Sequence, residues 1–168
     1  GIFGLGAIGF AFAKMAQGFG MRVISYSRHK KTDPKYDFIE QVDFDTFLKE
    51  SDVISIHAPL TPSTENTFDA EAFAKMKDGV ILINTARGGL IVEEALADAL
   101  HSGKVYGAGL DVLRDEPPKK DNPLFHLNNT SITAHIAWLT RASRLRAIDI
   151  AIENFKAYLN GTPTSVIN

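Results

Sequence analysis

The chain has 168 residues, of which 45% are hydrophobic and 23% charged, as in an ordinary folded globular protein. Its net charge of −2 gives no reason to expect nucleic acid or an acidic membrane as partner, and the lack of cysteine excludes disulfides and thiolate chemistry. No apolar run approaches the roughly 20 residues that span a bilayer, and no charged-then-apolar leader is seen, so we expect a cytoplasmic protein.

Short apolar runs alternate with helix-like segments along the whole chain. The runs that predict strands cover residues 1–3, 21–26, 52–58, 79–85, 105–112 and 130–135. Helices are predicted over residues 7–19, 43–50, 69–76, 92–103 and about 140–161, several of them stopped by a glycine. This alternation is typical of βαβ units. The sequence therefore predicts an α/β fold: a Rossmann-type, doubly wound parallel sheet with helices on both faces.

Glycines and polar residues follow the ends of the predicted strands. In an open parallel sheet, ligands bind beyond the carboxyl ends of the strands. Those ends carry the sequences GLGAIG, SRHKK, HAPLTPST and ARGG, then Asp111 and His135. We expect all of them to meet at one edge of the sheet.

The segment Gly4-Leu5-Gly6-Ala7-Ile8-Gly9 is a G-x-G-x-x-G motif between a strand and a helix. In this context it predicts a dinucleotide site, since Gly4 permits the tight turn and Gly6 lets N–H groups approach a pyrophosphate. The helix that begins near Ala7 would add a partial positive charge. A glycine-rich turn without a ligand is the alternative.

The second predicted strand departs from the pattern of an NAD-binding unit. Such a unit places an acid about 20 residues after the glycines, to bind the adenosine ribose. Here the strand is followed by Ser27 and Arg28, with no acid before Asp33. Serine removes a repulsive charge and arginine can pair with a 2′-phosphate, which favours NADP(H) or the use of both cofactors. A solvated basic loop is the alternative.

Arg87, Glu116 and His135 form a candidate catalytic set. The guanidinium of Arg87 suits a substrate carboxylate and its neighbouring carbonyl oxygen. If Glu116 accepts a hydrogen bond from one ring nitrogen of His135, the other nitrogen can give a proton to a carbonyl. Arg87 could instead form a surface ion pair, Glu116 could be a solvated loop acid, and His135 could be structural. Asp111 suggests a cofactor contact, or a cap on a turn.

The sequences GLGAIG, HAPLTPST, INTARGGLIVEEALADAL, GAGLDVLRDEPP and ITAHIAW, in this order, resemble the D-isomer-specific 2-hydroxyacid dehydrogenases. The resemblance implies that His135 is the general acid/base, Glu116 its partner and Arg87 the group that binds the substrate carboxylate. It also implies that Asp111 contacts the nicotinamide end of the cofactor. The full set of expected cofactor contacts is Gly4, Gly6, Ala7, Ile8, Gly9, Ser27, Arg28, Ala58, Pro59, Thr64, Thr85, Ala86, Asp111 and Ala137.

Within the family, EPPKKDNPL and HIAW are most similar to the glycerate dehydrogenases, also called hydroxypyruvate reductases. This implies hydride transfer between NAD(H) or NADP(H) and a small 2-hydroxy or 2-keto acid such as glycerate, hydroxypyruvate or glyoxylate. Ala134 stands where the family usually has proline, and Ser27 where NAD-linked members usually have aspartate. Two alternatives are a dehydrogenase for D-lactate or phosphoglycerate, and a dinucleotide-sensing protein like the corepressors that resemble this family.

The chain begins inside an apolar run, without methionine. Family members insert their dinucleotide domain into a second domain, and the active site lies between the two. We therefore expect residues 1–168 to be a dinucleotide-binding domain alone, with little turnover of its own. In the full-length protein we expect a homodimer, and no metal, nucleic acid or membrane as partner.

Overall fold

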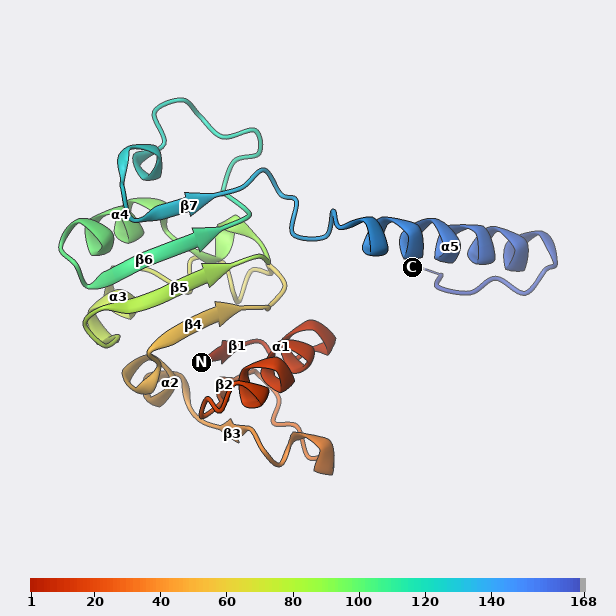
Figure 1. Ribbon diagram of the computed structural model, residues 1–168, viewed down its shortest axis with the longest axis horizontal. Helices are drawn as coiled ribbons and strands as arrows, with labels where there is room; N and C mark the ends of the chain where they lie inside the picture. The colour runs from red at the N-terminus through yellow and green to blue at the C-terminus, as the bar shows by residue number, and fades with distance from the viewer. Residues whose placement is uncertain (167–168) are drawn as a thin grey trace. The chain divides into compact units, whose positions relative to one another are not determined.

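The computed structural model describes residues 1–166 and contains a seven-stranded parallel sheet (Figure 1). The strands follow one another across the sheet in the order β3-β2-β1-β4-β5-β6-β7. Their bounds are β1 (Ile2–Phe3), β2 (Ile24–Tyr26), β3 (Glu40–Gln41), β4 (Val53–Ile56), β5 (Val80–Asn84), β6 (Val105–Leu110) and β7 (Thr130–Ile132). The strand order reverses between β1 and β4, and ligands of doubly wound sheets bind at such a reversal.

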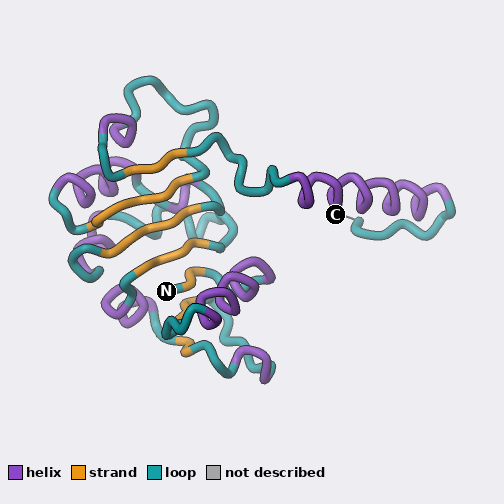
Figure 2. Tube along the Cα trace, in the orientation of Figure 1, coloured by secondary structure: helices purple, strands orange, loops and turns teal. Residues whose placement is uncertain are grey.

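Five α-helices lie among the described residues, close to the predicted segments (Figure 2). They are α1 (Ala7–Gly18), α2 (Phe44–Glu50), α3 (Ala70–Lys75), α4 (Glu93–His101) and α5 (Arg141–Leu159). Three short 3₁₀ helices are η1 (Pro34–Tyr36), η2 (Gly88–Leu90) and η3 (Pro123–His126). Gly20 and Gly103, just beyond α1 and α4, have positive φ, as predicted for glycines that end helices.

The strands are shorter than predicted, and one of them was missed. The predicted ranges extend past the ends of the strands, and Thr85, Asp111 and His135 lie in the loops that follow β5, β6 and β7. The missed strand β3 has only two residues, both polar, and pairs with β2 alone. A hydrophobic pattern cannot show a strand of this kind.

Neighbouring residues of β1 point to opposite faces of the sheet. Ile2 belongs to a small core with Ala13 of α1. Phe3 belongs to a larger core that contains Phe47 of α2 and Leu96 of α4, among others. Helices thus cover both faces of the sheet, which confirms the predicted doubly wound fold.

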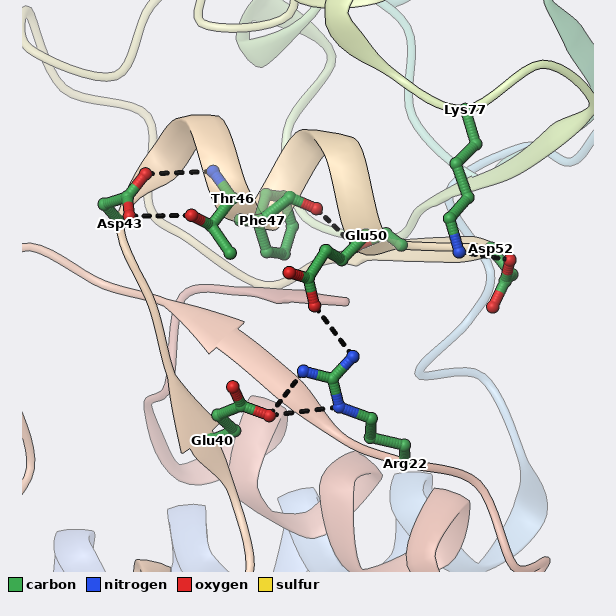
Figure 3. A network of polar contacts seen from close by, with 9 residues as sticks. Arg22, Glu40, Asp43, Thr46, Phe47, Glu50, Asp52 and Lys77 are labelled. Atoms are coloured by element: carbon green, nitrogen blue, oxygen red, sulfur yellow. Dashed lines mark hydrogen bonds and ion pairs between the residues drawn. The ribbon is translucent and has the colours of Figure 1, made fainter.

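Exposed ion pairs join α2 to the edge of the sheet (Figure 3). Arg22 precedes β2 and donates to Glu40 of β3 at 2.5 and 3.0 Å and to Glu50 at the end of α2 at 2.7 Å. At the other end of α2, the Asp43 carboxylate caps the helix by accepting the Thr46 N–H at 2.9 Å. That hydrogen bond keeps the pKa of Asp43 below its ordinary value.

Residues 1–134 form one compact unit, and the chain from His135 onward forms a second. The second unit consists chiefly of α5, whose N-cap Thr140 accepts the Ser143 N–H at 3.2 Å. Leu145, Ile148 and Phe155 are exposed on this helix. Within the described residues, no helix combines the length and the apolar character needed to cross a membrane.

Candidate functional site

A cavity of about 590 Å³ lies in the first unit, beyond the carboxyl ends of β1, β2 and β4. Seven predicted cofactor contacts line it: Gly4, Gly6, Ser27, Arg28, Ala58, Pro59 and Thr64. Its wall also contains Phe3, Tyr26 and Phe44, which provide an aromatic side. The cavity therefore lies at the reversal of strand order, where the sequence placed the dinucleotide.

The glycine motif forms the turn between β1 and α1. Gly4 has a φ of 94°, and a Cβ built there would lie 2.7 Å from the Ala58 backbone nitrogen. A Cβ on Gly9 would lie 2.2 Å from the Gly4 oxygen, so this glycine lets α1 pack against the turn. Gly6 is the N-cap of α1, and a Cβ there would meet no described atom within 4 Å. Space thus remains beside the first N–H groups of α1, as a bound pyrophosphate requires.

The loop after β2 brings basic groups to the cavity. Arg28, His29 and Lys31 line it, and the Arg28 guanidinium donates to the Ser63 hydroxyl. The Ser27 hydroxyl donates to the His29 carbonyl oxygen at 3.2 Å. Among the described residues that line the cavity, none is acidic. This end of the cavity is therefore suited to an anionic group.

Hydroxyl groups hold the loop after β4 in shape. The Thr64 hydroxyl donates to the Pro59 carbonyl oxygen at 2.7 Å and accepts the Thr61 N–H at 2.8 Å. Thr64 lines the cavity, but its hydroxyl is used inside the loop. We infer that Thr64 supports the shape of the wall.

His57 is a residue of the cavity wall that the sequence analysis did not single out. Its Nε2 shares a hydrogen bond of 2.9 Å with the Ser55 hydroxyl, and its ring lies 5.2 Å from that of Phe12 in α1. Burial lowers the pKa of His57 below the ordinary value of 6.5. The motif HAPLTPST contained this histidine, but only the contacts show that its ring is partly buried.

The loop after β5 is organised by Asn84, the last residue of the strand. Asn84 is fully buried, and its side-chain amide donates to the Arg87 carbonyl oxygen at 2.9 Å and accepts the Ala86 N–H at 3.0 Å. The Arg87 guanidinium is exposed and donates to the Ala86 carbonyl oxygen at 2.6 Å. Thr85 is exposed in the same turn. Arg87 thus projects from a turn whose backbone is held by the buried Asn84 side chain.

Two of the acids that follow β6 are predicted site residues. Asp111 is buried, and its carboxylate accepts the Thr133 hydroxyl at 2.5 Å, which links the loops after β6 and β7. Glu116 is exposed and accepts the Leu113 N–H at 3.3 Å. The Glu116–Pro117 peptide bond is cis. The neighbouring Asp115 pairs with Lys119 at 3.3 Å.

His135 lies three residues after β7 and begins the second unit, which also contains Ala137. Its φ of 55° is in the left-handed region, which a residue with a side chain seldom adopts. The prediction that His135 ends the last strand is wrong, because β7 stops at Ile132. Arg87, Glu116 and Asp111 belong to the first unit.

Comparison with known proteins decides the family. The family model described as D-isomer specific 2-hydroxyacid dehydrogenase, NAD binding domain, matches residues 1–137. The chain belongs to this family. A hydroxypyruvate reductase of Blautia hydrogenotrophica is 49% identical over 168 residues, covering all of this chain and 52% of that protein. A glycerate dehydrogenase of Methylorubrum extorquens is 42% identical over 172 residues, covering 99% of this chain and 52% of that protein.

Solved structures of a D-2-hydroxyacid dehydrogenase and of an imino acid reductase share the fold. A D-isomer specific 2-hydroxyacid dehydrogenase from Lactobacillus delbrueckii ssp. bulgaricus, in its NAD complexed form, has a TM-score of 0.92 at 35% identity. That match covers 99% of this chain and 55% of the other. An acyclic imino acid reductase in complex with NADPH and D-Arg has a TM-score of 0.89 at 38% identity, covering 99% of this chain and 52% of that one. The predicted nicotinamide cofactor is thereby supported, and the chain spans about half the length of the curated relatives it matches.

Proposed function

We propose that residues 1–168 are the dinucleotide-binding domain of a longer dehydrogenase that reduces hydroxypyruvate to D-glycerate, with glyoxylate as a second substrate. The relatives named hydroxypyruvate reductase and glycerate dehydrogenase support this choice, as does a glyoxylate reductase of Thermococcus litoralis that is 42% identical over 170 residues. The observation that carries the proposal is the position of Arg87 and Glu116. They follow the adjacent strands β5 and β6 in a domain of this family.

Each member of the catalytic set has a separate task. Arg87 holds the substrate carboxylate and stabilises the negative charge that develops on the keto oxygen as the keto carbon is reduced. His135 gives that oxygen a proton, and Glu116 orients the imidazole by accepting a hydrogen bond from its other nitrogen. A bound nicotinamide dinucleotide supplies the hydride. Truncating one of these side chains removes a charge-assisted hydrogen bond, worth roughly 1.5–3 kcal/mol.

We propose NADPH as the preferred cofactor, or the use of both NADPH and NADH. Arg28, His29 and Lys31 offer positive charge or hydrogen-bond donors to a 2′-phosphate, and Ser27 replaces the aspartate that would repel it. The Arg28–Ser63 hydrogen bond favours this interpretation over a solvated basic loop, because it holds the guanidinium at the cavity wall. The other predicted contacts remain proposed along the rest of the cofactor: Gly4, Gly6, Ala7, Ile8, Gly9, Ala58, Pro59, Thr64, Thr85, Ala86, Asp111 and Ala137. The homodimer and the cytoplasmic location stay predictions.

The test is the reduction of hydroxypyruvate and glyoxylate by the full-length protein, with NADPH and NADH titrated side by side. We expect turnover with both acids, loss of turnover in His135→Ala, and tighter binding of NADPH than of NADH. Arg28→Ala should reduce the preference for NADPH roughly tenfold to a hundredfold. Arg22→Ala is the matched control, since Arg22 binds Glu40 and Glu50 and lies outside the cavity wall. Near-normal activity in His135→Ala would refute the catalytic assignment.

A further inference from the structure

Glu93, the first residue of α4, carries a buried carboxylate whose two oxygens are both engaged. One oxygen accepts the backbone N–H of Arg114 at 2.8 Å, and the other accepts the side-chain amide of Asn122 at 2.8 Å. Both donors belong to the segment between β6 and η3, at least 21 residues further along the chain. Glu93 therefore fastens that segment to the start of α4.

The Arg114 side chain fastens the same segment to the loop after β4. Its guanidinium donates to the Glu65 carboxylate at 3.3 Å and to the Asn66 side-chain oxygen. The Asn66 N–H in turn donates to the Gly89 carbonyl oxygen at 2.9 Å, in the loop that carries Arg87. Three loops that follow three neighbouring strands are thus joined around Arg114.

The two attachments lie next to the group that contacts Glu116. The Leu113 N–H donates to the Glu116 carboxylate at 3.3 Å, and the next N–H along the chain is the one that Glu93 accepts. The backbone between Leu113 and Glu116 is therefore held at Arg114, by the Glu93 carboxylate and by the Arg114 side chain. An error of about 1 Å in the position of a catalytic group can reduce the rate about a hundredfold.

We propose that Glu93 and Arg114 are positioning residues, which act on the reaction by fixing the backbone that orients Glu116. The inference rests on the proposed function, because it assumes that Glu116 orients His135. Neither residue lines the cavity. Their loss should therefore affect the chemical step and leave dinucleotide binding unchanged.

The experiment compares Glu93→Gln, Glu116→Gln and the double variant in the full-length protein, with hydroxypyruvate and NADPH. Glutamine keeps the shape of Glu93 but offers one acceptor oxygen in place of two. We expect Glu93→Gln to lower kcat at least tenfold at an unchanged KM for NADPH. Because both changes act on the same group, the double variant should be no slower than Glu116→Gln alone. Glu94→Gln is the matched control, since Glu94 is the exposed neighbour on the same helix, and it should change nothing.

The outcomes separate the two proposals. If Glu116→Gln keeps full activity, the role of Glu116 in the proposed function is wrong. If Glu116→Gln is slow while Glu93→Gln is normal, or if the two losses multiply in the double variant, the positioning role is overturned. Should Glu93→Gln fail to fold, Arg114→Ala decides, since the Arg114 side chain is exposed and its removal leaves the Glu93 contact to the backbone intact. Its kcat should fall severalfold at an unchanged KM for NADPH, and an unchanged kcat would overturn the proposal.

Discussion

Replacing Gly88 by alanine would insert a methyl group into the backbone of the neighbouring loop. A Cβ at Gly88 would lie 1.9 Å from the carbonyl carbon of Leu113, 2.1 Å from its oxygen and 2.3 Å from the Arg114 nitrogen. Carbon atoms in favourable contact are about 3.5–4.0 Å apart, so one of the two loops must move. Overpacking costs about 1–3 kcal/mol in general. We expect about 3 kcal/mol or more for Gly88→Ala, because backbone atoms cannot rotate out of the way.

Gly89→Ala is the matched control. A Cβ there would meet the end of the Leu60 side chain, at 2.9 Å from Cδ2, and a flexible side chain can move aside. For a domain of this size, about 1 kcal/mol shifts Tm by roughly 2–4 °C. Thermal unfolding followed by circular dichroism should therefore show a loss of about 6–12 °C for Gly88→Ala and a loss of about 2 °C or less for Gly89→Ala. Equal losses in the two variants would show that the close packing of these loops does not stabilise the domain.

Three further predictions concern the cofactor turn, the buried histidine and the edge of the sheet. Gly4→Ala should weaken dinucleotide binding at least tenfold in a fluorescence titration, because Gly4 has positive φ and an added Cβ would meet the Ala58 backbone. Gly18→Ala, where a Cβ meets no described atom within 4 Å, should bind normally. Burial lowers the pKa of His57, so the unfolded state binds its proton first and the protein loses stability as the pH falls below about 6.5. His57→Asn should lose less stability between about pH 7 and pH 5 in urea unfolding, and equal losses would contradict the assignment. Arg22→Ala should lower the urea midpoint of unfolding only a little, because the ion pairs of Arg22 are exposed. At about 1 M salt, which screens such pairs, the midpoint should not change, and a large loss there would contradict this view.

Most of the fold could be predicted because its signals are local. Buried parallel strands need continuous apolar runs, and helices that end at a left-handed residue favour glycine, so β5 and the end of α4 were predicted within a few residues. The ends of the strands were predicted less well. The predicted runs 105–112 and 130–135 extend beyond β6 and β7, which end at Leu110 and Ile132, and only backbone geometry shows where a strand ends.

The candidate site was also predicted only in part. The sequence predicted that polar residues after the strand ends would meet at one edge of the sheet, because the topology of a parallel sheet gathers those ends. Arg28 lines the cavity there, whereas the roles of Arg87 and Glu116 stay predictions. It did not predict the roles of Asn84 and Glu93, whose buried side chains bond to the backbone of the loops after β5 and β6. The partners of Glu93 are 21 and 29 residues away, so no spacing in the sequence indicates its role. Asn84 bonds to Ala86 and Arg87 in its own turn, and only the hydrogen bonds of the folded turn show this.

The two sides of the site are held by different kinds of contact. This difference determines which substitutions can change the cofactor preference and leave the other loops in place. The loops after β4, β5 and β6 are joined through backbone atoms: the Asn66 N–H donates to the Gly89 oxygen, the Asp111 N–H donates to the Asn84 oxygen, and Gly88 lies against the Leu113 backbone. The Arg28 end of the loop after β2 meets the loop after β4 through a contact between exposed side chains, Arg28 and Ser63. Substitutions at Ser27 and Arg28 can therefore alter the proposed contact with the cofactor without moving the loops that carry Arg87 and Glu116. We expect a few substitutions at this end to change the cofactor preference of the domain. Changes at Gly88 or Glu93 should instead disturb the loops that carry the proposed catalytic residues Arg87 and Glu116.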